Sequence, residues 1–167
     1  MLRAPGAMLN RMNERDILLT QLEQAFRRKS WHGTNLLGSI RGIGVETAAW
    51  RPTAGRHNIW ELIVHAAYWK YSVLRRFSGD TRLTFPLKGS NWFIRPVEKT
   101  ESALKADITR LKDYHGKLID AVAKFPAHRL SGIAKGSSTS YLDLAIGVAA
   151  HDLYHAGQIQ LLKRLSR

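Results

Sequence analysis

Apolar residues recur every three or four positions along four stretches of the chain, which is the spacing of one face of an α-helix. The stretches cover residues 13–30, 58–79, 98–124 and about 139–165. In the second stretch the apolar positions are Leu62, Ala66, Trp69, Val73 and Phe77. Each stretch alternates this apolar stripe with polar positions, so the pattern predicts four amphipathic helices that bury one face against each other.

Residues with special backbone preferences mark the ends of these helices. Asn58, followed three residues later by Glu61, is typical of a capping box at a helix start, and Gly79 ends the same helix. Pro126 stops the third helix, and the run 136–138 (Gly-Ser-Ser) precedes the fourth.

The connections contain two short helical pieces, residues 35–39 and 46–50, and one long loop, residues 79–97, without strand alternation. We therefore predict an all-α, antiparallel four-helix bundle that forms a single domain over residues 13–167. Residues 1–12 are interpreted as a flexible N-terminal extension, because they lack the apolar core of a signal peptide.

The amino-acid composition limits the kinds of site that the chain can form and the compartment that we expect for it. The 167 residues are 44% apolar and 23% charged, as in an ordinary soluble domain, and no apolar run approaches the roughly 20 residues that span a bilayer. The chain has no cysteine, which excludes disulfides, thiolate metal sites and a thiol nucleophile of its own. These features predict a cytoplasmic protein with no membrane partner.

The formal net charge is +13, which raises the question of nucleic-acid binding. The basic residues stand in short groups near helix ends, where they complement the helix dipole, instead of forming one long basic segment. The scatter argues against nucleic acid as the main partner. An anionic small-molecule substrate would use the same positive field.

The inner stripe of the last helix carries unusual polar residues. It reads Leu144, Val148, His151, His155, Gln158 and Leu162. His151 and His155 lie one turn apart, so their rings can converge on one ion. A catalytic ion usually takes three protein ligands, and His65, on the inward face of the second helix, is the natural third. The alternative is that these are core histidines bonded to neighbours.

The remaining four histidines point less clearly to chemistry, although His57 could lie near the mouth of the site; they are His32, His57, His115 and His128. Two glycines interrupt the last helix. Close packing is the preferred interpretation of Gly147, whereas Gly157 fits either close packing or room beside the metal.

Three segments resemble a known family. The run 151–159 (HDLYHAGQI) resembles the closing motif of the DinB-like, also called YfiT-like, metal-binding bundles. The run 57–69 (HNIWELIVHAAYW) is similar to that family's first metal-ligand segment, and the run 26–33 (FRRKSWHG) is similar to its first helix and turn. The resemblance implies an up-down-down-up bundle, frequent homodimers and a metal site on His65, His151 and His155. Some relatives are transferases or isomerases that use bacillithiol or mycothiol.

The leading functional hypothesis is a metal-dependent enzyme in which the ion activates a low-molecular-weight thiol, or water, for attack on a small electrophile. Any thiol must be a cosubstrate, since the chain has none. Gln158 and Tyr154 are the candidates for orienting the reacting groups. Zinc is the favoured divalent ion and nickel the next, because imidazole suits both.

Two alternatives remain. The spacing His151-Asp152-x-x-His155 resembles the zinc-protease pattern His-Glu-x-x-His, so metal-dependent hydrolysis of a small molecule stays open. Aspartate is one methylene shorter than glutamate, and Asp152 is interpreted instead as an acid behind the ligands or on the surface. The second alternative is a non-enzymatic bundle that binds a metal or ligand, or that docks to nucleic acid.

Overall fold

The computed structural model describes residues 13–167, and its named elements are helices. No β-strand occurs within this range, which confirms the predicted all-α class. The predicted extension, residues 1–12, lies outside the described residues. The elements are α1 (Glu14–Phe26), α2 (Leu36–Ser39), α3 (Val45–Ala49), α4 (Ile59–Ser78), α5 (Glu101–Lys124), a 3₁₀ turn (Ala127–Arg129) and α6 (Tyr141–Leu165).

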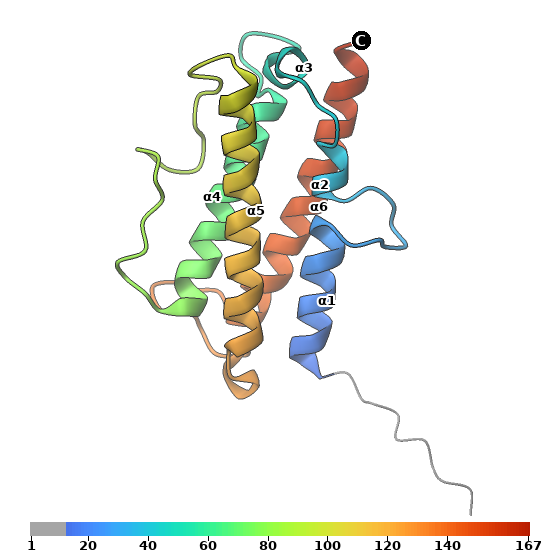
Figure 1. Ribbon diagram of the computed structural model, residues 1–167. Helices are drawn as coiled ribbons and strands as arrows, with labels where there is room; N and C mark the ends of the chain where they lie inside the picture. The colour runs from blue at the N-terminus through green and yellow to red at the C-terminus, as the bar shows by residue number, and fades with distance from the viewer. Residues whose placement is uncertain (1–12) are drawn as a thin grey trace, which may run out of the picture.

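The four long helices form an up-down-down-up bundle (Figure 1). In this view α1 and α6 run upward, whereas α4 and α5 run downward. Helix α4 packs against α5 and α6, and α1 packs against the same two helices. The long loop between α4 and α5 returns along the outside of the bundle so that α5 can run parallel to α4. None of the described helices is long and apolar enough to cross a membrane.

Polar caps fix the starts of the long helices. The side chain of Asn58 accepts a hydrogen bond from the Glu61 amide, and Gly79 ends α4 in the left-handed region with φ 66°. The Glu61 carboxylate does not complete the predicted capping box, because it binds Arg51 and His57 instead. Thr100 caps α5 in the same way as Asn58, so α5 begins three residues after the predicted start.

Helix α1 ends at Phe26, four residues before the predicted end. The amides of Arg27 and Arg28 both donate to the carbonyl of Glu23, at 2.9 and 2.7 Å. The Arg28 bond spans five residues instead of the four of an α-helix, so the backbone leaves the helical path here. The chain then turns through Gly33, whose φ of 96° favours glycine.

The buried face of α6 is wider than the predicted stripe. Ala145, Asp152 and Ile159 are buried, whereas Leu144 and Gln158, predicted to be inward, are only half-buried. The reason is that α6 packs against α1, α2 and α4 together, so its core face is centred between those helices. This position leaves Leu144 and Gln158 at the edges of the buried face.

Candidate metal centre

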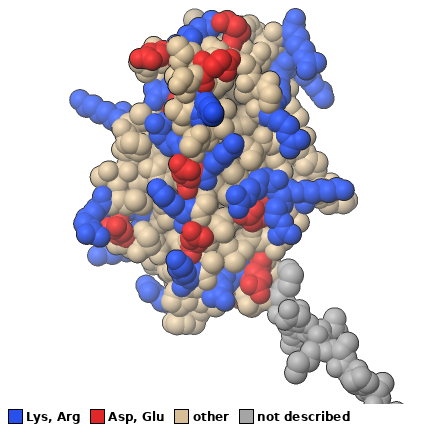
Figure 2. Space-filling model, in the orientation of Figure 1, with Lys and Arg blue, Asp and Glu red and all other residues tan. Residues whose placement is uncertain are grey.

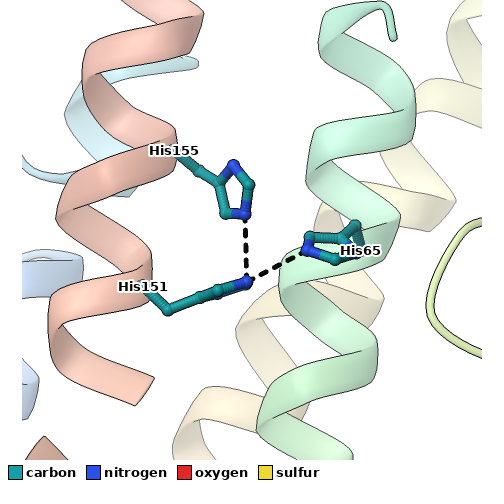
Figure 3. Close-up of side chains that lie close together, drawn as sticks. All are labelled: His65, His151 and His155. Carbon is teal, nitrogen blue, oxygen red and sulfur yellow. Dashed lines mark hydrogen bonds between the residues drawn. The ribbon is translucent and has the colours of Figure 1, made fainter. Parts of the chain in front are cut away.

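Three imidazoles meet between α4 and α6 (Figure 3). The Nε2 atom of His151 lies 3.0 Å from the Nε2 atom of His65 and 3.0 Å from that of His155. The ligand atoms of all three residues lie within 4.8 Å of one another. The three residues that the sequence singled out are therefore brought together, two from α6 and one from α4.

Two of the rings are held by their other nitrogen. Nδ1 of His65 donates to the backbone carbonyl of Asn91 at 2.9 Å, and Nδ1 of His155 donates to Oε1 of Gln158 at 2.7 Å. Because these oxygens are acceptors, both Nδ1 atoms carry the proton of the neutral ring. Their Nε2 atoms then present lone pairs toward His151, in the tautomer that binds a metal through Nε2.

The donor set fits a divalent cation. Nε2 of His151 can donate a proton to at most one of its two neighbours, so in the neutral state at least one of their lone pairs faces Nε2 of His151 without receiving a proton. An ion between the rings satisfies all three nitrogens at once. Tetrahedral zinc with bonds of 2.0–2.1 Å separates its nitrogen ligands by about 3.3 Å, close to the 3.0 Å between Nε2 of His151 and Nε2 of each of the other two histidines.

Burial keeps these histidines neutral. It lowers the pKa of His65 to about 4 and the pKa of His151 to about 3, and it also lowers the pKa of His155. Neighbouring imidazoles strengthen the effect, because positive charge on one ring disfavours charge on the next. At neutral pH the rings are therefore in the form that binds metals.

An aromatic stack covers one side of the site. The ring of Trp92 stacks nearly parallel on the ring of His65, with 3.8 Å between the ring centres. Trp92 also stacks on His57, with 3.6 Å between the ring centres. Nδ1 of His57 donates to the carboxylate of Glu61 at 2.9 Å, and Arg51 binds the same carboxylate. His57 therefore lies close to His65 through their shared contact with Trp92, and its place at the mouth of the site stays a prediction.

The long loop contributes residues that the helical pattern did not identify. Asn91 adopts a left-handed backbone with φ 63°, which asparagine tolerates better than most residues. Its carbonyl binds His65, and its side-chain oxygen accepts a hydrogen bond of 2.9 Å from Nε1 of Trp69. The only signals in the sequence were the turn-forming residues Gly89 to Asn91 and a tryptophan in a loop.

Gln158 and Tyr154, the two candidates for orienting the reacting groups, lie at different positions relative to the site. Gln158 contacts the ring of His155 directly, as described above. Tyr154 is 65% exposed, and its ring lies edge-on to that of His155 with 5.1 Å between the ring centres. A role of Tyr154 in orienting reactants stays a prediction.

Other expectations need correction. Asp152 is fully buried and forms an ion pair with Lys70, so it does not lie on the surface. Close packing does not explain Gly147, because a Cβ atom there would meet nothing within 4 Å; the same holds for Gly157.

His115 is fully buried and stacked on the ring of Phe26, outside the site. His32 and His128 are exposed.

The fold and the site together define the class of protein. It is an up-down-down-up helical bundle that carries three convergent imidazoles on two neighbouring helices. Residues 29–159 match the DinB superfamily, and the chain belongs to that superfamily. The matched range includes all three histidines together with Asn91 and Gln158. No curated protein and no solved structure matches the chain.

Proposed function

We propose that His65, His151 and His155 bind one divalent metal ion, with zinc favoured and nickel next, and that the protein is a metal-dependent enzyme. The observation that carries the proposal is the convergence of three Nε2 atoms whose rings are neutral. Such an ion supplies Lewis acidity that favours the deprotonated form of a bound thiol or water. The substrate is a small electrophile.

The protein's own residues would prepare this chemistry. Asn91 and Gln158 hold two rings in the metal-binding tautomer, and Trp92 covers His65 on one side. A thiol nucleophile has to be a low-molecular-weight cosubstrate, because the chain has no cysteine. The homodimer stays a prediction, which light scattering of the purified protein tests.

Thiol activation is favoured over a zinc-protease type of hydrolysis. In that hydrolysis the acid next to the first histidine acts as the general base. Here Asp152 is fully buried, and its Oδ2 atom lies 2.5 Å from Nζ of Lys70. A carboxylate in that position cannot take a proton from water at the open side of the site. Hydrolysis would need another base, and His57, which stacks on Trp92, is a candidate.

A nucleic-acid interface is the weaker alternative. On the face shown in Figure 2, lysine and arginine side chains are interspersed with acidic ones, and they do not form one continuous basic surface. Binding to nucleic acid through phosphates depends steeply on salt concentration. Retention on DNA-cellulose that disappears with salt would favour this alternative.

Metal content of untagged protein, measured by plasma mass spectrometry, tests the proposal. We expect about one ion per chain in the wild type and almost none in His65→Ala and His151→Ala. His128→Ala is the matched control, since that histidine is exposed in the 3₁₀ turn. Protein without metal even after reconstitution would refute the proposal. If metal is present, consumption of a small thiol with a model electrophile, lost in His151→Ala, tests the reaction.

A further inference from the structure

A cavity of about 430 Å³ lies between α4 and α6, directly beside His151 of the candidate metal centre. Its residues include His151 itself, so the cavity and the candidate metal centre share a wall. The rest of the lining is mainly apolar. The residues that matter are Trp69, Val73 and Arg76 from α4 and Leu144, Gly147 and His151 from α6.

The cavity is elongated along the helix axes. Trp69 and Arg76 lie seven positions apart on α4, and Leu144 and His151 lie seven positions apart on α6. At a rise of 1.5 Å per residue, each wall is about 10 Å long. One end is at the histidines and the other is at Arg76. A ligand in this groove would reach the site with one end and the guanidinium with the other.

The guanidinium of Arg76 is only partly satisfied. Its Nη1 atom donates to the carbonyl and to the hydroxyl of Ser72, both at 3.3 Å. Its Nε atom is buried and has no hydrogen-bond partner. Within residues 13–167, no ion pair involves Arg76. Asp143 also lines the groove, but its carboxylate forms no ion pair with Arg76 and accepts a hydrogen bond of 2.6 Å from Ser140 instead. The unpaired charge at the end of an apolar groove therefore calls for an anionic partner.

Gly147 opens the middle of the groove. Glycine inside a helix costs about 1 kcal/mol relative to alanine, so a reason for it is expected. A Cβ atom at this position would meet nothing within 4 Å, which removes packing against a neighbour as that reason. The missing side chain instead leaves space between His151 and Leu144, one turn below the candidate metal centre.

We propose that this groove binds an organic acid with an extended apolar body, whose carboxylate pairs with Arg76 and whose other end lies beside His151. The carboxylate is recognised by Nη2 of Arg76, since only the Nη1 atom of this guanidinium donates hydrogen bonds to the protein. The apolar body is buried against Val73 and Leu144. That the bound acid is the electrophilic substrate rests on the proposed function. Its binding in the groove does not depend on that function.

Calorimetric titration of the full-length protein tests the groove without an activity assay. The probes are octanoate, whose extended chain is about as long as the groove, acetate, which lacks the apolar body, and octanamide, which lacks the charge. We expect octanoate to bind at least about tenfold more tightly than either of the other two, because both the chain and the charge contribute. Equal affinity for octanoate and octanamide would overturn the role of Arg76, and equal affinity for octanoate and acetate would overturn the role of the groove.

Two pairs of variants locate the binding. Arg76→Gln should weaken octanoate binding at least about tenfold. Arg75→Gln, at the exposed preceding position on α4, should not change it. Gly147→Leu should block the groove, whereas Gly157→Leu, which is exposed on α6 outside the groove, should not. Thermal melts test whether each variant is folded. If Arg76→Gln does not fold, the Gly147 pair carries the test.

The metal content of the same samples separates the two proposals. Octanoate binding that depends on Arg76 in a protein without metal would support the groove and refute the proposed enzyme. A metal-loaded protein in which octanoate binds equally to the wild type, Arg76→Gln and Gly147→Leu would refute the groove and leave the metal centre intact.

Discussion

Lys70 on α4 and Asp152 on α6 form an ion pair in the core, with 2.5 Å between Nζ and Oδ2 and no exposed surface on either side chain. The ammonium group also lies 4.7 Å from the centre of the Phe26 ring, a cation–π contact with α1. The pair joins the two helices that supply the three histidines, and Asp152 follows His151 directly. It therefore fixes how α6 is rotated against α4 at the site.

Removing one partner of this pair should be strongly destabilising. In Lys70→Met the carboxylate of Asp152 stays in the core without a counter-charge, which typically costs about 3–5 kcal/mol. Urea unfolding followed by circular dichroism measures the loss. The double variant Lys70→Met with Asp152→Leu is the control and should recover most of the stability, because no buried charge remains. A loss below about 1 kcal/mol in the single variant would contradict the buried pair.

The sequence predicts the helices well because their signals are local. Asn58 and Gly79 bound α4 through hydrogen bonds within a few residues, and the periodic stripes need only the helical repeat. The pairing of Lys70 with Asp152 joins residues 82 positions apart, so it depends on how two helices meet. From the sequence alone, a lysine and an aspartate look like surface residues.

The candidate site likewise combines residues that the local sequence pattern predicts with residues that it does not. The histidine spacing on α6 and the inward place of His65 predict the three residues that meet. The loop residue Asn91 could not be predicted, because its contacts with His65 and Trp69 arise only when the long loop folds back over α4. The groove was missed for a related reason. The preferred interpretation of Gly147 assumed a neighbouring helix that the structure places elsewhere.

Stability should fall with acidification because of His115. Burial lowers the pKa of this histidine far below its ordinary value, and both ring nitrogens are buried without a hydrogen bond. Between about pH 7 and about pH 5 the unfolded chain therefore takes up a proton that the folded chain does not, which costs about 2 kcal/mol for one such group. Unfolding of wild type and His115→Phe at both pH values measures this. The variant should lose less stability than the wild type over the interval, and identical losses would contradict the prediction.

Metal binding should resist acid for the same physical reason. Burial lowers the pKa of His65 to about 4 and that of His151 to about 3, so protons compete weakly for their nitrogens until the pH approaches those values. The metal affinity should change less than about tenfold between about pH 7 and about pH 5.5, whereas three imidazoles with ordinary pKa values would lose more than about a hundredfold. Competition with a chelator of known pH dependence measures the affinity. Release of the ion near pH 6.5 would show that the rings titrate as exposed histidines do.

Gln158 and Tyr154 can be separated by their effect on the metal. Gln158 accepts the Nδ1 proton of His155 at 2.7 Å, and losing such a support typically weakens metal binding about 10- to 100-fold. Gln158→Ala should show this loss, and Gln158→Glu should retain binding because a carboxylate still accepts the proton. Gln160→Ala, on the same helix outside the site, is the matched control.

Tyr154→Phe should leave the metal affinity unchanged, because the tyrosine is mostly exposed and touches His155 only through its ring. A loss of thiol consumption in Tyr154→Phe with normal metal content would then assign the hydroxyl to the reactants. If Gln158→Ala binds metal as tightly as the wild type, the tautomer of His155 is not held by this hydrogen bond, and the orientation of its ring must come from packing between α4 and α6 alone.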